Sequence, residues 1–290
     1  MSQLIKIGQK LNLEDFINRE WLLKFGEPAV VISLLNECGI SFVEFKISER
    51  TNTELVLGIA KVCGNEGVFV AFQTDYQSGL LPQTFRKGAE KKYEQILSLA
   101  DTVANITESP VPFTFNWGGY SQSVNEQNFD EALYNSKKFF QWVSNITSGR
   151  LSNIIPLCGT QEFKLDKNNK AFQIDNCDQI FQTCDVEICW DFGRQWLSNY
   201  KNGKNLPDEH FVSRTGHVHA YDAYKSETGI ESNFPLGDGL IPWKEYCAIL
   251  ARHCYSDTIL LDVNPAIFRD LDDLLFFTRD GIEKLSYYFG

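Results

Sequence analysis

The sequence has few histidines, no surplus of positive charge and no long apolar run. Its 290 residues contain four histidines, 27 basic and 38 acidic side chains, for a formal net charge of −11 at pH 7. That balance argues against a general binder of nucleic acid or of membrane surfaces, because neutralising phosphates requires Lys and Arg. So few histidines also limit any His-rich multi-metal cluster. The chain lacks the run of roughly 18 apolar residues that a transmembrane helix needs.

Two further absences concern the compartment. The first residues lack the basic segment and following apolar segment of a secretory signal peptide. None of the eight cysteines forms a CxxC pair, and free thiols are the default in a reducing cytosol. We therefore expect a cytoplasmic protein.

What the chain does contain is a regular series of short apolar runs typical of strands. Their first residues lie 27 to 44 residues apart, which leaves room for a helix in each gap. The runs are Leu4–Lys10, Ser41–Ile47, Val68–Gln73, Pro112–Trp117, Asn153–Cys158, Val186–Asp191, Gly216–Tyr221 and Thr258–Val263.

Apolar residues at helical spacing fill these gaps. The predicted helices are Pro28–Cys38, Thr53–Val62, Ala89–Ala104, Phe129–Ile146, Asn176–Thr183, Gln195–Tyr200, Trp243–His253 and Leu271–Phe289. Strict alternation of strand and helix indicates parallel strands with right-handed crossovers. An open doubly wound sheet is the competing layout, but no GxGxxG follows the first strand. We predict a single-domain (β/α)8 TIM barrel over residues 1–290.

Function in such a barrel lies at the carboxyl ends of the strands, and three units place chemical groups there. Asp191 ends the sixth strand, where a carboxylate suits a divalent metal or acid–base work, or simply caps the next helix. His217 and His219 share one face of the seventh strand. Either could bind a metal or act as an acid–base group. The alternative is a histidine that is merely hydrogen-bonded within the barrel, and it applies above all to His217, which lies deeper. Asp262 adds a carboxylate at the eighth strand.

The second unit and one loop offer contacts to a ligand. Glu44 and Lys46 share a strand face, where they could pair inside the barrel mouth and meet substrate. The glycines of the loop over residues 234–239 would permit close approach of a ligand or phosphate.

Five segments in order resemble a known family, the xylose isomerase-like sugar isomerase and epimerase barrels. Gly39-Ile-Ser-Phe-Val-Glu44-Phe resembles the family's G-hydrophobic-x-x-V-E-L, and Ile188-Cys-Trp-Asp191-Phe-Gly-Arg194 resembles its hydrophobic-x-x-D-T-G-H. The remaining three are Val218-His219-Ala-Tyr-Asp222, Pro235-Leu-Gly-Asp-Gly239 and Ile259-Leu-Leu-Asp262-Val-Asn-Pro265. The resemblance spans nearly the whole chain.

The resemblance implies a divalent metal (Mn, Mg, Co or Zn) at the strand ends and proton transfer between adjacent sugar carbons through an enediolate. Asp191 and His219 match the second and third ligands, and Asp262 stands at the fourth. The first ligand departs from the pattern: the fifth strand has no Glu at its end, and Cys158 falls at or near that position. Glu162 could approach from the following loop. Asp262 or Glu162 would act as the base.

Three functional readings remain open. The first is a metal-dependent sugar or polyol isomerase or epimerase with altered ligands. The second is a non-catalytic barrel that binds a sugar or polyol, and the third is a different metal-assisted reaction such as hydrolysis or dehydration. An endonuclease is disfavoured by the charge and the scarcity of histidine. We expect a small-molecule sugar or polyol as partner, no nucleic acid and no membrane, and a homo-oligomer is compatible with the sequence. The candidate substrate-binding residues are Glu44, Lys46, Trp117, Arg194, His217, Asp222 and Lys225.

Overall fold

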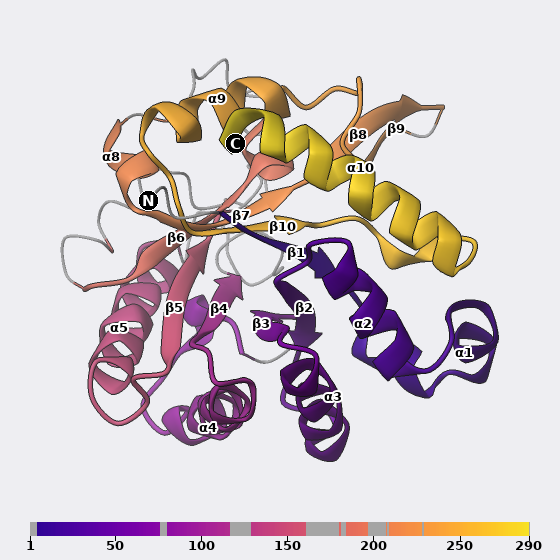
Figure 1. Ribbon diagram of the computed structural model, residues 1–290. Coiled ribbons are helices and arrows are strands. Elements are labelled where there is room, and N and C mark those ends of the chain that lie inside the picture. Colours follow the sequence, from indigo (N-terminus) through magenta and orange to yellow (C-terminus); the bar gives the residue numbers. More distant parts are fainter. Residues whose placement is uncertain are drawn as a thin grey trace.

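Eight parallel strands close into a barrel in the computed structural model (Figure 1). It describes residues 5–75, 80–116, 129–160, 180, 184–196, 207, 209–227 and 229–289. The strands follow one another around the barrel in the order β1-β10-β7-β6-β5-β4-β3-β2. They are β1 (Lys6–Lys10), β2 (Phe42–Ile47), β3 (Phe69–Thr74), β4 (Val111–Asn116), β5 (Ile154–Gly159), β6 (Glu187–Asp191), β7 (Thr215–Ala220) and β10 (Thr258–Leu261).

The eight predicted strands are therefore confirmed, each within two residues at either end, and so is the barrel. Helices cover the outside of the ring (Figure 1). They are α1 (Arg19–Phe25), α2 (Pro28–Glu37), α3 (Thr53–Asn65), α4 (Glu90–Thr107), α5 (Phe129–Thr147), α8 (Glu209–Ser213), α9 (Trp243–Arg252) and α10 (Leu271–Phe289). Short 3-10 helices occupy Leu13–Ile17, Pro82–Thr84 and Pro265–Ile267. Among the described residues, no helix is both long and apolar enough to cross a membrane.

Local signals explain where several helices begin and end. The side chain of Asn52 accepts hydrogen bonds from the backbone N–H groups of Glu54 and Leu55, so it caps the first turn of α3. Pro28 opens α2, where a missing N–H costs nothing. Gly39 follows α2 with φ +102°, a left-handed conformation that stops the helix. The next strand, β2, then starts after a two-residue step.

The apolar core has two parts. The larger lies between the strands and the helices, and Phe113 and Phe115 of β4 point into it toward Phe139 of α5. The smaller lies inside the barrel and consists of Phe42, Phe69, Ala71 and Leu260. Gly8 makes room for it, because a Cβ on Gly8 would lie 2.3 Å from the ring of Phe42. This inner cluster fills one end of the barrel below the polar side chains.

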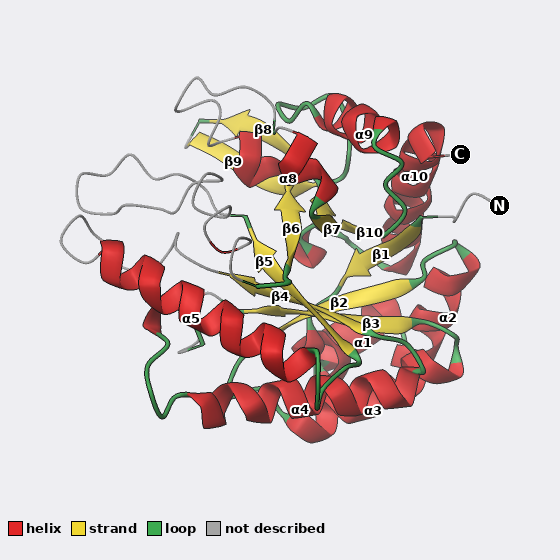
Figure 2. Cartoon of the chain, turned by 90° about the vertical axis from the view of Figure 1, so that its left-hand side faces the viewer, coloured by secondary structure: helices red, strands yellow, loops and turns green. Residues whose placement is uncertain are grey.

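A two-stranded antiparallel hairpin interrupts the alternation after β7. Its strands are β8 (Asp222–Ser226) and β9 (Gly229–Phe234), and Figure 2 shows them beyond the arrowhead of β6. Sequence periodicity missed this hairpin because β9 is largely exposed and polar, so it lacks the apolar run of the barrel strands. Its final turn touches the barrel: Asn233 donates from Nδ2 to the backbone carbonyl of Asp262 at 2.9 Å.

Candidate metal and sugar site

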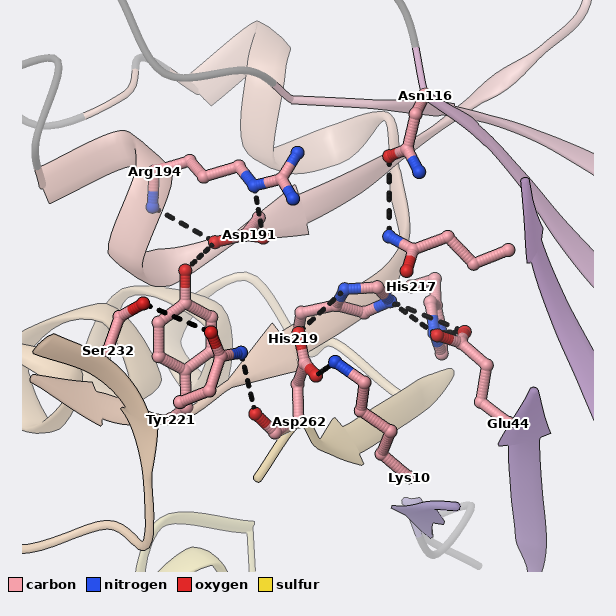
Figure 3. A network of polar contacts seen from close by, with 12 residues as sticks. Lys10, Glu44, Asn116, Asp191, Arg194, His217, His219, Tyr221, Ser232 and Asp262 are labelled. Carbon is pink, nitrogen blue, oxygen red and sulfur yellow. Dashed lines mark hydrogen bonds and ion pairs between the residues drawn. The ribbon is translucent and has the colours of Figure 1, made fainter. Parts of the chain in front are cut away.

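Three neighbouring strands bring Asp191, His219 and Asp262 together at one end of the barrel. Asp191 is the last residue of β6 and pairs in register with His219 of β7, and Asp262 directly follows β10. One ligand atom from each lies within 4.8 Å of those of the other two, and all three residues are buried. The three ligand candidates that match the family pattern therefore converge, as Figure 3 shows.

The Asp191 carboxylate is held from two sides. Tyr221 donates its hydroxyl to Oδ1 at 2.7 Å, and Arg194 contacts Oδ2 through Nε at 3.0 Å. The backbone N–H of Arg194 also donates to Oδ1 at 2.9 Å. Burial nevertheless raises the pKa of Asp191 to about 6, partly offset by His219. Because burial disfavours the charged form of Asp191, a further cation nearby would stabilise that form.

The two ring nitrogens of His219 face different carboxylates. Its Nε2 lies 3.3 Å from the carboxylate of Glu44 on β2. Its Nδ1 lies 3.5 Å from Oδ2 of Asp262 and has no hydrogen-bond partner among the described residues. Burial opposes protonation of the ring, but Cys189, Glu44 and Asp262 together raise the pKa of His219. A buried nitrogen without a partner, flanked by two carboxylates, fits a divalent cation.

Lys10, which the sequence reasoning missed, ends β1 and contacts Oδ1 of Asp262. Burial would raise the pKa of Asp262, but Lys10 and His219 hold it well below its usual range. The sequence does indicate this position, because alternation along β1 places Lys10 on the same face as Gly8, inside the barrel. Lys10 was not singled out because one lysine at a strand end is usually a solvated charge.

One layer deeper, Glu44 lies between two histidines. His217 contacts Oε2 of Glu44 through Nε2 at 3.1 Å, and its Nδ1 lies 2.7 Å from the hydroxyl of Thr258. Burial opposes ionisation of Glu44, yet the two histidines lower its pKa to about 2. These contacts replace the pairing with Lys46 that the shared strand face suggested. The side chain of Lys46 instead reaches an exposed position near the end of β2.

The structure does not bring Cys158 to this site. Cys158 pairs in register with Phe115 and Ile188, whose side chains lie in the outer core, and its own side chain belongs to that core. Gly159 takes the inward position on β5 instead, between Asn116 and Cys189. The fifth strand therefore presents no side chain where the family pattern has its first ligand.

Asp222 has a structural role here. Its carboxylate accepts hydrogen bonds from four backbone N–H groups, those of Ala223, Gly237, Gly239 and Ile241, at 2.8 to 3.2 Å. A Cβ on Gly239 would lie 2.4 Å from Oδ1 of Asp222. The loop glycines thus accommodate this carboxylate, where the sequence suggested an approach to a ligand.

The other predicted substrate contacts lie outside this cluster or cannot be placed. Lys225 is exposed on the hairpin strand β8. Trp117 and Glu162 fall outside the described residues. Two predicted substrate contacts have charged groups that touch the trio of Asp191, His219 and Asp262: Arg194 contacts Asp191, and Glu44 contacts His219.

Solved structures with the same fold include several sugar-processing barrels. A xylose isomerase domain-containing protein from Salmonella typhimurium LT2 superposes with a TM-score of 0.64 at 10% identity, over 96% of each chain. The chain has the fold of the xylose isomerase-like TIM barrels. D-psicose 3-epimerase from Clostridium cellulolyticum H10, solved with D-tagatose, gives a TM-score of 0.64 at 11% identity over 98% of this chain and 99% of the other.

Two further structures widen the comparison. The IolI protein, solved with a bound zinc atom, gives a TM-score of 0.66 at 12% identity over 97% of this chain and 99% of the other. An AP endonuclease of family 2 from Brucella melitensis is also similar, with a TM-score of 0.60 at 12% identity. No protein-family model matches the chain, and no curated protein matches it significantly. The likeness thus concerns the fold.

Proposed function

We propose that this chain is a metal-dependent isomerase or epimerase of a sugar or polyol. The observation that carries the proposal is the buried trio of Asp191, His219 and Asp262, whose ligand atoms lie within 4.8 Å of one another at the ends of three adjacent strands. The fold shared with sugar epimerases agrees with it. The chemistry is proton transfer between adjacent carbons through an enediolate.

The trio would hold a divalent cation of the Mn, Mg, Co or Zn group. When bound, such a cation stabilises negative charge on a substrate oxygen. Tyr221 and Arg194 keep the Asp191 carboxylate in one orientation through three contacts, and Asn233 holds the backbone at Asp262. Contacts that hold the carboxylates in fixed orientations in this way keep the ligand atoms at the positions that a metal ion requires.

Asp262 is the proposed acid–base group. Lys10 contacts one of its oxygens and so fixes the orientation of the carboxylate that would accept a proton from a substrate carbon. Arg194 and Lys46 are proposed to bind substrate oxygens, since both carry cationic groups close to the trio or the end of β2. Glu162 stays a second candidate for the base.

One observation favours a second candidate, a sugar-binding barrel without catalysis. Lys10 and Arg194 already pair with the two carboxylates of the trio, those of Asp262 and Asp191, and Gly159 leaves the first ligand position without a side chain. The side chains of Lys10 and Arg194 would then balance the charge of the two carboxylates in place of a metal ion. The two functions differ in metal content and in proton exchange.

Both differences can be measured on the same preparation. Protein purified without chelator should carry a divalent metal, and it should exchange substrate C–H protons with deuterium from solvent when given free and phosphorylated ketoses. Asp262→Asn should abolish exchange. Asp257→Asn is the matched control, because Asp257 precedes the same strand at its opposite end. Protein that holds little metal and gains neither binding nor exchange on addition of Mn, Mg, Co or Zn would favour the non-catalytic barrel.

A further inference from the structure

A second set of metal-type donors lies one layer below the trio. Cys189, His217 and His219 each offer a ligand atom within 4.8 Å of those of the other two, and they are at most 1% exposed. Cys189 of β6 pairs in register with His217 of β7. Across the barrel, Oε2 of Glu44 lies 3.1 Å from Nε2 of His217 and 3.3 Å from Nε2 of His219.

The hydrogen atoms around His217 can be arranged in two ways. The hydroxyl of Thr258 has a single hydrogen, and it lies within bonding distance of the carbonyl of Gly216 at 3.2 Å and of Nδ1 of His217 at 2.7 Å. If the hydroxyl donates to the carbonyl, Nδ1 must carry the ring hydrogen and donate to Thr258. The Nε2 lone pair of a neutral ring then faces the Glu44 carboxylate at 3.1 Å. In that arrangement two acceptors face each other, and a cation between or beside them would remove the repulsion. In the other arrangement Thr258 donates to Nδ1 and Nε2 donates to Glu44, and every atom has a partner.

We propose that Cys189, His217, His219 and Glu44 form a structural zinc site inside the barrel. A histidine that donates its other ring N–H to a neighbouring oxygen, as His217 would to Thr258, is the usual arrangement of a metal ligand. A thiolate among the donors selects zinc over magnesium or manganese, and the thiol of Cys189 loses its proton on binding. Four protein ligands without an open position are typical of a structural site.

This site differs from the proposed catalytic trio but is joined to it, and both ions could be held at once only if the ring of His219 lost its remaining proton. It shares one residue with the trio, His219, whose Nδ1 faces Asp262 while its Nε2 faces Glu44. The other ligands differ. An ion at this depth would link β2 to β6 and β7, which lie on other parts of the ring, with β1 and β10 between β2 and β7. It would therefore tie one wall of the barrel to the other.

The test uses the full-length chain. Protein expressed in zinc-supplemented medium and dialysed against EDTA should retain about one zinc ion per chain by elemental analysis, since a closed four-ligand site releases its ion slowly. Cys189→Ser should lose this zinc. Cys158→Ser should keep it, because Cys158 is an equally buried cysteine that points into the outer core. Wild-type protein without retained zinc, or Cys189→Ser protein that keeps it, overturns the proposal.

A second measurement decides the matter if Cys189→Ser fails to fold. Protein produced with cobalt in place of zinc should show thiolate-to-cobalt charge transfer in the near ultraviolet, and Cys158→Ser should show the same band. Absence of the band in cobalt-loaded wild-type protein rules out a thiolate ligand. Retained zinc together with missing proton exchange would uphold this site while contradicting the proposed function.

Discussion

The two sides of the barrel interior carry different kinds of polar group. The side formed by β6, β7 and β10 presents ionisable residues, namely Cys189, Asp191, His217, His219 and Asp262. The opposite side presents Gln73, Thr114, Asn116 and Gly159, none of which carries a charge. Gln73 donates to Asn116 at 3.3 Å, and the backbone N–H of Asn116 donates to Thr74 at 2.9 Å. Most polar groups on the neutral side bond to one another, although the Thr114 hydroxyl has no partner among the described residues, whereas the charged side needs counter-charges.

The largest expected effect comes from removing a charge on the ionisable side. Asp262→Asn leaves Lys10 buried without its carboxylate, so we expect a loss of about 3–5 kcal/mol in the free energy of unfolding. Urea denaturation measures it. The double variant Lys10→Met/Asp262→Asn should recover part of this loss, because the uncompensated ammonium is gone. If the single and double variants are equally unstable, the ion pair is not what stabilises this side.

Removing a supporting hydrogen bond should have a smaller effect. Tyr221→Phe deletes the donor to Oδ1 of Asp191, and we expect divalent-metal affinity to fall about 10–100-fold without loss of the fold. Isothermal titration with Mn²⁺ measures this. Tyr224→Phe serves as the control, since Tyr224 lies exposed on the hairpin. Equal affinities in the two variants would show that Tyr221 does not orient the ligand.

The difference between the two sides can also be reduced by adding a charge to the neutral one. Gly159→Asp places a carboxylate on β5 facing inward, and Thr114→Ser removes the methyl group that its Cβ would meet at 3.0 Å. In the double variant we expect metal affinity to rise about tenfold, roughly 1.4 kcal/mol. Thr114→Ser alone is the control. An unchanged affinity would mean that the cation does not lie within reach of β5.

The smallest expected effect is on stability and concerns Asp257, which lies just before β10 at the end of the barrel opposite to the trio. Burial raises the pKa of Asp257, so its charged form is disfavoured in the folded state. Asp257→Asn should therefore stabilise the protein slightly above that pKa. The gain should shrink as the pH falls through the ordinary aspartate pKa of 3.8 and vanish well below it, where the aspartate is neutral in both states. Because the Asp257 side chain is only partly buried, we expect less than about 0.5 kcal/mol at pH 7. Denaturation at pH 7 and pH 3.5 measures this, and the gain in the free energy of unfolding should be smaller at pH 3.5. A variant that is less stable than the wild type at pH 7 would contradict the prediction.

The fold was predictable because its strands are buried on both faces. Such strands read as short apolar runs, and their spacing leaves room for the covering helices. Asp191, His219 and Asp262 were predictable as neighbours for a related reason: each stands at a strand end, and the ends of parallel strands meet. The hairpin β8–β9 was missed because its exposed strands lack an apolar run.

The contacts across the barrel were not predictable. Glu44 pairs with His217 and His219, which come more than 170 residues later, and no local pattern encodes that choice over Lys46. Cys158 illustrates a second limit. A shift of one position along a strand reverses the face on which a side chain lies, so Cys158 and Gly159 exchange roles. Strand boundaries inferred from composition do not resolve a single position.

The contact between Gly8 and Phe42 decides how the protein can be used. Because Gly8 has no side chain, the ring of Phe42 fills the lower interior and stacks on Phe69 at 5.0 Å between centroids. Among the described residues, this packing closes the lower end of the barrel interior. Under the proposed function, a substrate and its product would therefore share the opening at the carboxyl ends of the strands.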